Sequence, residues 1–228
     1  MEEIAQIDET YTENLGTLVG RSFFLDPPAR VAPCLLGKLL VTENGAAGRI
    51  VEVEAYLGPH CAPADPAAHA FRGPTQRNRV LFGPAGHAYV YAIYGRYFCM
   101  NISCEPEGRA GCVLLRALVP VSGFSVLARN RGLETDATPA QLTSGPSRLC
   151  QALGITREAH NGVDLLDASS PLQVRDDGWT PERIRVGARI GIKQAADWPL
   201  RFFVEGEPCV SGPKRLNESG SVLSEIRK

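Results

Sequence analysis

Two carboxylates and one arginine have the residue types and spacing that could support acid–base chemistry. Glu52 and Glu54 stand at alternate positions of the segment 51–56, whose apolar and polar residues alternate as in a strand with one face on the core. The other face would carry both carboxylates and Tyr56. A carboxylate placed in this way can stabilise developing positive charge and accept a proton from water. Arg116 lies alone in an apolar run, where an unpaired buried charge is costly, so we expect it to have an anionic partner.

A second alternating segment predicts a hairpin next to these groups. Residues 89–94 alternate in the same way and carry three tyrosines, the pattern breaks at Gly95, and it resumes over residues 97–102. This predicts a β-hairpin whose tip is Tyr94-Gly95-Arg96. An aromatic side chain and an arginine at an exposed turn predict a protruding wedge.

The remaining patterns predict an α+β fold. Apolar runs predict further strands at residues 35–42, 111–118, 186–192 and 200–204, and a helix is expected near 124–131. The segment 144–154 is typical of a capped helix, with serine at its start, proline in its first turn and glycine after its end. No further element is expected after Val210.

Composition is typical of a soluble, intracellular protein with one core. The chain has 228 residues, of which 44% are hydrophobic and 21% charged. We expect one domain over residues 21–212, an acidic and partly mobile segment over 1–20, and a polar tail over 213–228. Residues 1–15 hold five acids and no basic residue, unlike a secretory signal, and no apolar run reaches the length of a membrane span. The expected location is the cytoplasm, with nucleoid association if the source is bacterial.

The cysteines predict neither a disulfide framework nor a zinc knuckle. There are seven of them, an odd number, and none forms a Cys-x-x-Cys pair. His60, Cys61, Asp65 and His69 lie close together in the sequence, but their spacing matches no common metal site. No metal and no other cofactor is therefore expected. The fingerprints of Rossmann, P-loop and Gly-x-Ser-x-Gly enzymes are also missing.

Charge is distributed unevenly along the chain. The formal net charge is −1, yet residues 69–131 hold eight arginines against two acids. Arginine suits planar contacts with phosphate, and tyrosines interleaved with arginines provide surfaces on which bases stack. This segment therefore predicts a nucleic-acid surface. The alternative is that these arginines are solvated and paired with acids elsewhere.

Several blocks of sequence, taken together, resemble the alkyladenine (3-methyladenine) DNA glycosylase family. The resemblance runs in order from about Leu25 to Val210, and it rests on independent blocks at consistent spacing. These blocks are Glu54–Pro59, Asp65–His69, Arg77–Arg79, Tyr89–Gly95, Asn101–Ile102, Leu114–Leu118 and Ser144–Ser147.

The resemblance implies both a fold and an activity. The fold is a single-domain α+β structure with a curved antiparallel β-sheet, surrounding helices and a protruding hairpin, similar to the C-terminal domain of methionyl-tRNA formyltransferases. The activity is that of a metal-free, monomeric DNA glycosylase. It would flip alkylated or deaminated purines (3-methyladenine, hypoxanthine, ethenoadenine) out of double-stranded DNA and hydrolyse their N-glycosidic bond, which initiates base excision repair. The chain has four lysines, none in these blocks, so no Schiff-base lyase activity is expected.

By the same resemblance, individual residues take roles at the site. Glu54 matches the general base, and Arg116 with the backbone carbonyl of Ile190 would hold the water and the phosphate beside it. Tyr56, Tyr91 and His69 match the residues around the flipped base, Asn101 the residue facing the amino group of guanine, and Tyr94 the intercalating wedge. Contacts to the DNA backbone would come from Arg72, Arg77, Asn78, Arg79, Arg96 and Ser144.

Some alternatives stay open at this point. Alternation cannot separate Glu52 from Glu54, and only the family motif selects Glu54. A non-catalytic module that binds damaged DNA or structured RNA, or a formyltransferase-like tRNA-binding domain, would not require Glu54 at all. Two departures from the family pattern concern DNA affinity. The segment 60–64 is longer than expected, and Pro74 and Gln76 replace an arginine and a proline of that pattern.

Overall fold

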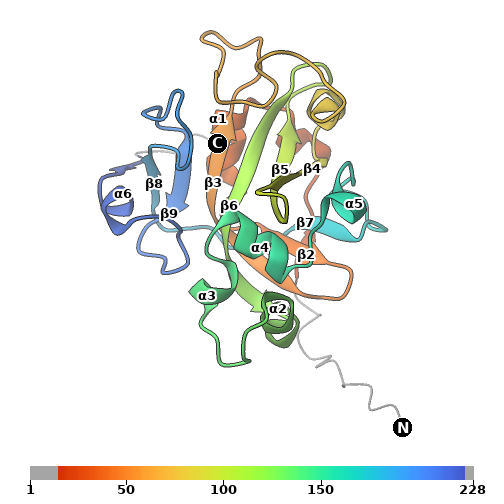
Figure 1. The fold of residues 1–228 in the computed structure, drawn as a ribbon, viewed down its shortest axis with the longest axis vertical. Coiled ribbons are helices and arrows are strands. Elements are labelled where there is room, and N and C mark those ends of the chain that lie inside the picture. The colour runs from red at the N-terminus through yellow and green to blue at the C-terminus, as the bar shows by residue number, and fades with distance from the viewer. Residues whose placement is uncertain (1–14, 224–228) are drawn as a thin grey trace.

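A curved antiparallel sheet of ten strands organises residues 15–223, the part of the chain that this computed structural model describes (Figure 1). Its main path runs in the order β1-β7-β2-β3-β6-β5-β4, and β9, β8 and β10 branch from β3. The strands are β1 Thr17–Leu18, β2 Leu39–Thr42, β3 Ala47–Tyr56, β4 Ala88–Ile93, β5 Tyr97–Cys104, β6 Gly111–Ser122, β7 Leu172–Asp176, β8 Ile184–Gly187, β9 Arg201–Val204 and β10 Ser221–Val222.

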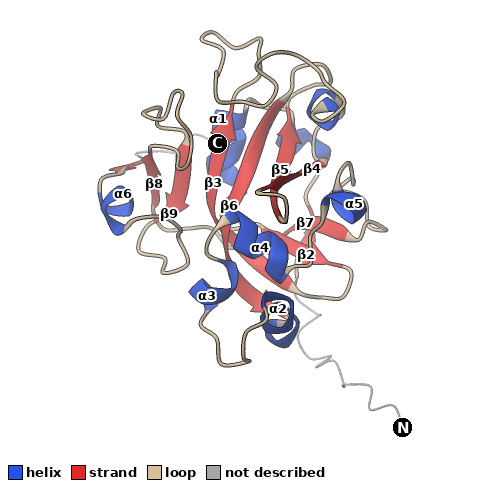
Figure 2. Cartoon of the chain, in the orientation of Figure 1, coloured by secondary structure: helices blue, strands red, loops and turns tan. Residues whose placement is uncertain are grey.

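Short helices surround this sheet, as the blue elements of Figure 2 show. They are α1 Pro28–Leu35, α2 Phe124–Arg131, α3 Pro139–Thr143, α4 Pro146–Ala152, α5 Arg157–His160 and α6 Lys214–Glu218, with 3₁₀ turns at Arg21–Phe24 and Arg79–Phe82. Leu35 of α1, Leu127 of α2 and Leu149 of α4 all join one buried core with Ile50 and Val53 of β3. Between residues 15 and 223, no helix has the length and apolar character that crossing a bilayer requires. The predicted α+β class is confirmed, whereas the similarity to the formyltransferase domain stays a prediction.

Strand β3 lies at the centre of the sheet and carries the predicted carboxylates. It pairs with β6 along its length, while its other edge pairs first with β2 and then with β9. The predicted alternation is confirmed from Glu52 onward, because Val53 and Ala55 enter the main core and Glu54 and Tyr56 point the other way. Val51, expected on the core face, instead packs in a separate small cluster, because a register shift between Ile50 and Glu52 interrupts the ladder. That second face is not open to solvent, however: Glu52 and Glu54 are both completely buried. A polar interior, rather than a wet strand face, therefore surrounds them.

A β-bulge lies where β6 passes these carboxylates. In the β3–β6 ladder Glu52 is opposite Ala117 and Val53 is opposite Leu115, so Arg116 has no partner across the ladder. A bulge of this kind breaks the strict alternation of a strand and changes the direction in which one side chain points. Here it lets the side chain of Arg116 reach both carboxylates from an otherwise apolar strand.

The helix predicted at 144–154 is α4, but Ser144 does not begin it. Ser144 instead follows α3 and forms an isolated bridge with Ala117. Gly145, with φ at 121°, occupies the capping position, and no side chain caps the helix. The proline in the first turn and Gly154 after the end agree with the prediction.

The ends of the chain differ from the expectation in other ways. The run 35–42 is the end of α1 followed by β2, and the strand predicted at 186–192 is β8, four residues long and begun earlier. Beyond Val210 the chain adds α6 and β10, and β10 pairs with β8. Most of the acidic N-terminal segment, residues 1–14, lies outside the described residues.

Candidate active site

Glu54, buried on the second face of β3, is held by three donors. The backbone N–H of Ile190 donates to Oε1 at 2.7 Å, and the hydroxyl of Tyr56 donates to Oε2 at 2.9 Å. The guanidinium of Arg116 forms an ion pair with Oε1 at 3.1 Å. Burial raises the pKa of Glu54 above its ordinary value, and these three contacts offset part of that rise. Such a carboxylate is fixed in orientation and is a stronger base than a solvated one.

Glu52 has a different environment, although it lies on the same strand face. Its Oε1 accepts from Nε of Arg116 at 3.0 Å and from Nε of Arg201 at 2.6 Å, and its Oε2 accepts from the backbone N–H of Ser211 at 2.6 Å. Arg201 is itself completely buried. Both oxygens of Glu52 are thus used within the protein. Glu52 orients Arg116 toward Glu54, and the two carboxylates that alternation could not separate have different roles in the network.

A buried ion pair holds the loop that contacts Glu54. The guanidinium of Arg189 binds both carboxylate oxygens of Asp65, at 2.5 and 2.9 Å, and both side chains are fully buried. The same guanidinium lies 4.6 Å from the centre of the Tyr56 ring. This pair fixes the position of Ile190, the next residue along the chain. We expected the carbonyl of Ile190 at the site; the contact with Glu54 is made by its N–H group.

Neither Asp65 nor Arg189 was predicted as a site residue. The sequence did point to both segments: Asp65 lies four residues before His69, and Arg189 directly precedes Ile190, and both His69 and Ile190 were predicted at the site. Their pairing joins residues 124 positions apart, which strand alternation does not reveal.

A cluster of aromatic side chains lies beyond Tyr56. The ring of His69 meets the ring of Tyr91 edge-on at 4.6 Å, and its Nδ1 is 3.0 Å from the hydroxyl of Tyr89. Tyr89 stacks on Tyr91 at 5.4 Å, and Tyr56 and Tyr91 pack against the same small core that contains Tyr89. Burial, with a smaller contribution from Arg77, lowers the pKa of His69, which favours the neutral imidazole. The structure therefore brings together Tyr56, His69 and Tyr91 as predicted, and it adds Tyr89.

Asn101 lies in β5 directly opposite Tyr89 of β4. Residues that face each other across an antiparallel pair place their side chains on the same side of the sheet. Asn101 is buried, and its amide oxygen lies 3.6 Å from the thiol of Cys112, another member of the small core around Tyr89. The predicted pocket residue is thus located at the base of the aromatic cluster.

The hairpin between β4 and β5 presents its tip to solvent, as expected. Tyr94 is 91% exposed, and Tyr94 and Gly95 both have positive φ, 49° and 75°. A tyrosine in this backbone region is uncommon, and strained residues of this kind concentrate at functional sites. Arg96 follows and lies over the ring of Tyr97, 4.8 Å from its centre.

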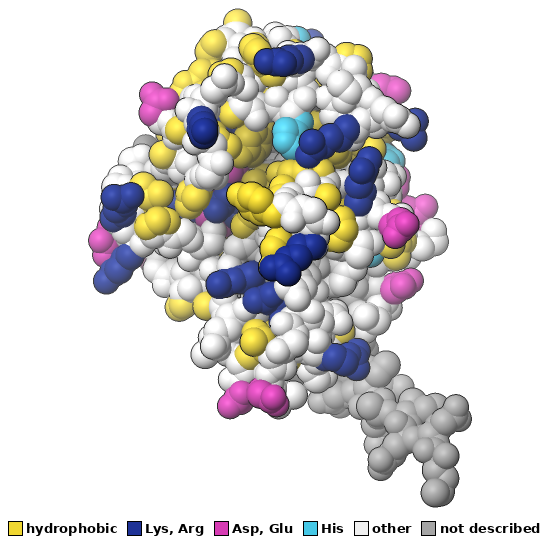
Figure 3. Space-filling model, in the orientation of Figure 1, with side chains coloured by type: hydrophobic (Ala, Val, Ile, Leu, Met, Phe, Trp, Pro, Cys, Tyr) yellow, Lys and Arg dark blue, Asp and Glu magenta, His cyan; other side chains and the backbone are white. Residues whose placement is uncertain are grey.

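Basic side chains are frequent on the face of the molecule shown in Figure 3, and acidic groups lie mostly at its margins. Arg72, Arg77, Arg79 and Arg96 are all exposed, as a contact with the DNA backbone would require. Arg77 also lies over the ring of Tyr91, 5.5 Å from its centre. This arrangement connects the basic surface with the aromatic cluster.

Asn78 and Ser144, predicted to contact the DNA backbone, are less accessible than the arginines. The amide of Asn78 is buried: its oxygen accepts from the N–H of Thr75 at 2.6 Å, and its nitrogen donates to the carbonyl of His69 at 2.8 Å. These bonds fix the loop that carries His69. They also leave the side-chain amide with no free group for a phosphate. Ser144 is half-buried beside β6.

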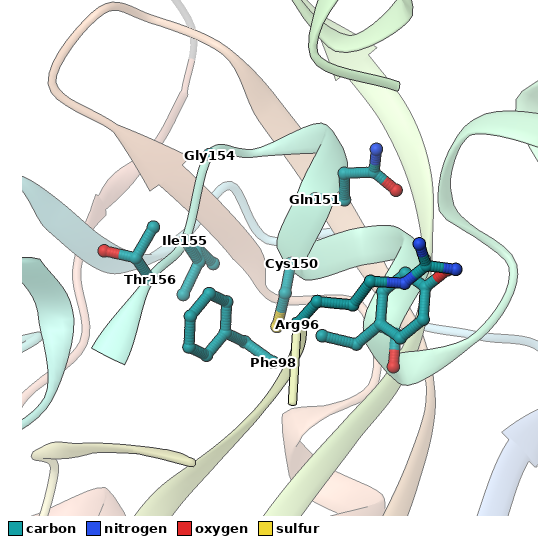
Figure 4. Close-up of a pocket in the computed structure, with 9 residues that line it drawn as sticks. Arg96, Phe98, Cys150, Gln151, Gly154, Ile155 and Thr156 are labelled. Carbon is teal, nitrogen blue, oxygen red and sulfur yellow. The ribbon is translucent and has the colours of Figure 1, made fainter. Parts of the chain in front are cut away.

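A separate cavity of about 420 Å³ lies between the base of the hairpin and α4. Figure 4 shows Phe98, Cys150 and Ile155 lying side by side in it, with Arg96 nearby. It contains neither Glu54 nor the aromatic cluster. A second hollow, of about 470 Å³, lies beside His69 and is lined by Arg72 and Gln194 among others. This second hollow continues the predicted site toward the exposed arginines.

Comparison with known proteins identifies the family. The family model described as methylpurine-DNA glycosylase (MPG) matches residues 22–208. A protein of Koribacter versatilis is 50% identical over 202 residues, 86% of this chain and 94% of that protein. A protein of Methanoculleus marisnigri is 50% identical over 196 residues, 83% and 96% of the two chains. One of Rhodopseudomonas palustris is 49% identical over 199 residues, 87% and 90%. All three are provisionally named 3-methyladenine DNA glycosylases. The chain belongs to the methylpurine-DNA glycosylase family.

Proposed function

We propose that this protein is a monofunctional DNA glycosylase that removes alkylated or deaminated purines from duplex DNA, the first step of base excision repair. The observation that carries this proposal is the environment of Glu54. It is a fully buried carboxylate, fixed by Ile190, Tyr56 and Arg116, and it adjoins a cluster of tyrosines and a histidine at a basic surface. A protein that only binds DNA has no need of a buried base with a raised pKa.

Reaching the glycosidic bond requires the nucleotide to leave the duplex. Extrusion costs a few kcal/mol of unstacking, and a side chain inserted into the gap offsets part of this. Tyr94 supports the role of wedge, because it is almost fully exposed at a hairpin tip next to Arg96. Arg72, Arg77 and Arg79 would hold the phosphates on either side, since all three are exposed cations near the aromatic cluster.

The extruded base would stack between Tyr56 and Tyr91, with His69 at the third side. As the base departs, positive charge develops on the sugar in the manner of an oxocarbenium ion. Glu54 would stabilise this charge and take a proton from the attacking water, and Arg116 would keep the carboxylate ionised. Asn101 at the base of the cluster would face the exocyclic amino group that guanine carries and adenine lacks.

Cleavage of the DNA strand is not part of this activity. A lyase step needs an amine that forms a Schiff base with the sugar. Of the four lysines, Lys38 is paired with Asp176 at 2.7 Å. Within residues 15–223 no lysine bonds to Glu54, Tyr56 or Arg116.

The test uses duplexes that contain hypoxanthine, ethenoadenine or 3-methyladenine, incubated with the protein and then cleaved at abasic sites with hot alkali. We expect strand scission after alkali with at least one lesion, and none without alkali. Glu54→Gln should abolish scission and retain binding, while Glu43→Gln, an exposed change on another loop, should leave both intact. Intact strands with every lesion, or full activity in Glu54→Gln, would contradict the proposal and favour a non-catalytic binding module.

A further inference from the structure

Three side chains with metal-binding atoms meet where the loop that follows β3 approaches the turn after β5. His60 and Cys61 lie in this loop, and Glu105 lies in the turn after β5. Nε2 of His60 is 3.0 Å from Oε1 of Glu105 and 3.9 Å from Sγ of Cys61. One ligand atom from each residue lies within 4.8 Å of the other two. The site lies apart from Glu54 and is not used in the proposed reaction.

Glu105 has one carboxylate oxygen that finds no hydrogen-bond partner among the described residues. The residue is 2% exposed, and its Oε2 is buried with no hydrogen-bond partner. A buried carboxylate oxygen without a partner is costly, and in native structures such an oxygen calls for an unseen water or ion. The unsatisfied atom belongs to the same carboxylate that already contacts His60.

Two glycines leave the space that these side chains occupy. A Cβ atom at Gly58 would lie 2.1 Å from the carbonyl oxygen of Arg109 and 2.5 Å from Cε1 of the His60 ring. One at Gly111 would lie 2.3 Å from Oε2 of Glu105 and 2.5 Å from the ring of Pro28. Glycine at both positions therefore leaves room for the imidazole and the carboxylate in tightly packed surroundings.

Two of the three separations are close to those that a tetrahedral transition metal imposes. With metal–ligand distances of about 2.0 Å for nitrogen or oxygen and about 2.3 Å for sulfur, tetrahedral geometry places N and O about 3.3 Å apart and N or O about 3.5 Å from S. The observed N–O and N–S distances of 3.0 and 3.9 Å differ from these values by a few tenths of an ångström. The oxygen and sulfur atoms lie up to 4.8 Å apart, so metal binding would require the partly exposed side chain of Cys61 to move toward Glu105. We propose that His60, Cys61 and Glu105 form a binding site for one zinc-like divalent cation, with a fourth position open to solvent.

Asp65 and His69, which lie close to His60 and Cys61 in the sequence, take no part in this cluster. Asp65 is fully engaged by Arg189, and His69 belongs to the aromatic cluster. The third ligand comes instead from Glu105, 44 positions beyond Cys61. The spacing of His60 and Cys61 therefore could not indicate a metal site, because common zinc motifs are recognised by ligands that lie close together in the sequence.

A metal at this site would brace the candidate active site without entering the chemistry. It would join the loop after β3 to the turn after β5, and the same loop ends at Asp65, which holds Arg189 beside Tyr56. The backbone N–H of Leu57 also bonds to Asp65, at 3.2 Å, so both ends of the loop meet at that carboxylate. The cation is thus a structural clamp, and its presence does not depend on the proposed glycosylase activity.

The test is direct metal binding to the full-length protein after treatment with a chelator. Co²⁺ should bind with one equivalent and give the near-ultraviolet absorption of a thiolate–cobalt bond, and Zn²⁺ should displace it. Cys61→Ser should abolish this absorption and weaken binding at least tenfold. Glu105→Gln should weaken binding by about as much. Cys34→Ser is the matched control, because Cys34 is another half-buried free thiol, and it should bind as the unaltered protein does.

A second measurement needs no variant. Added Zn²⁺ should slow alkylation of Cys61 in the unaltered protein at least tenfold and leave that of Cys34 unchanged, as read by mass spectrometry of the peptides. The proposal is overturned by the lack of a thiolate–cobalt band, by a band that persists in Cys61→Ser, or by equal alkylation of Cys61 with and without Zn²⁺.

Discussion

Replacing Tyr56 with phenylalanine removes one hydrogen bond from Glu54 and keeps the aromatic ring. The hydroxyl donates to Oε2 of Glu54 at 2.9 Å, and burial together with the nearby carboxylate raises the pKa of Tyr56, so the hydroxyl stays protonated. A hydrogen bond to an ionised group contributes about 1.5–3 kcal/mol. At about 1.4 kcal/mol for each pH unit, its loss should raise the pKa of Glu54 by roughly one to two pH units.

The consequence is a shift in the pH dependence of base excision. A general base must be ionised, so activity falls as pH drops through the pKa of Glu54. Because Tyr56→Phe raises that pKa, the acid limb of single-turnover excision should move to higher pH, while the rate on the alkaline side stays close to that of the unaltered protein. Tyr91→Phe is the matched control, since no hydrogen bond joins Tyr91 to Glu54, and it should leave the acid limb in place. An acid limb that is unmoved, or moves to lower pH, in Tyr56→Phe would show that the Tyr56 hydroxyl does not stabilise ionised Glu54.

Three further predictions concern stability and DNA recognition. Burial raises the pKa of Glu54, so ionisation at neutral pH opposes folding; Glu54→Gln should therefore increase the melting temperature while it abolishes excision, and a lower melting temperature would contradict this. Asp65→Ala leaves the buried guanidinium of Arg189 without its partner and should lower the free energy of unfolding in urea by about 3–5 kcal/mol. Arg183→Ala, at an exposed ion pair, should change that free energy by less than about 1 kcal/mol, and equal effects would disprove the argument. Tyr94→Ala should weaken binding to a lesion duplex about tenfold more than binding to undamaged DNA, as one lost stacking contact implies, with no change in melting temperature because the side chain is 91% exposed.

Local sequence patterns predicted those parts of the site that depend on a single strand or turn. Alternation correctly placed Glu52, Glu54 and Tyr56 on one face of β3, since side chains two apart in a strand share a face. The break at Gly95 correctly located the tip of the hairpin. These features need only the geometry of one element, which a short stretch of sequence contains.

Features that depend on distant segments could not be predicted in this way. The partners that occupy Glu52 lie at Arg201 and Ser211, about 150 residues further along the chain, so no local pattern distinguishes the two carboxylates. The bulge that directs Arg116 toward them is a property of the β3–β6 pairing and not of β6 alone. The environment of Asn78 depends on distant contacts as well: its side chain lies between exposed arginines in the sequence, but its amide bonds inward to the carbonyl of His69.

The sharing of Arg116 between two carboxylates explains how Glu54 can serve as a base in so buried a position. Glu52 has a second cation in Arg201, so Arg116 is not needed to neutralise it alone and can approach Glu54 at 3.1 Å. The pKa of Glu54 is still raised, which means that its three donors compensate only part of the cost of burial. The remaining cost is relieved by any positive charge that forms beside the carboxylate. An oxocarbenium-like sugar is such a charge, and it is absent before the bond breaks. In the proposed reaction Glu54 would therefore stabilise the transition state more than the bound substrate, which is the condition for catalysis.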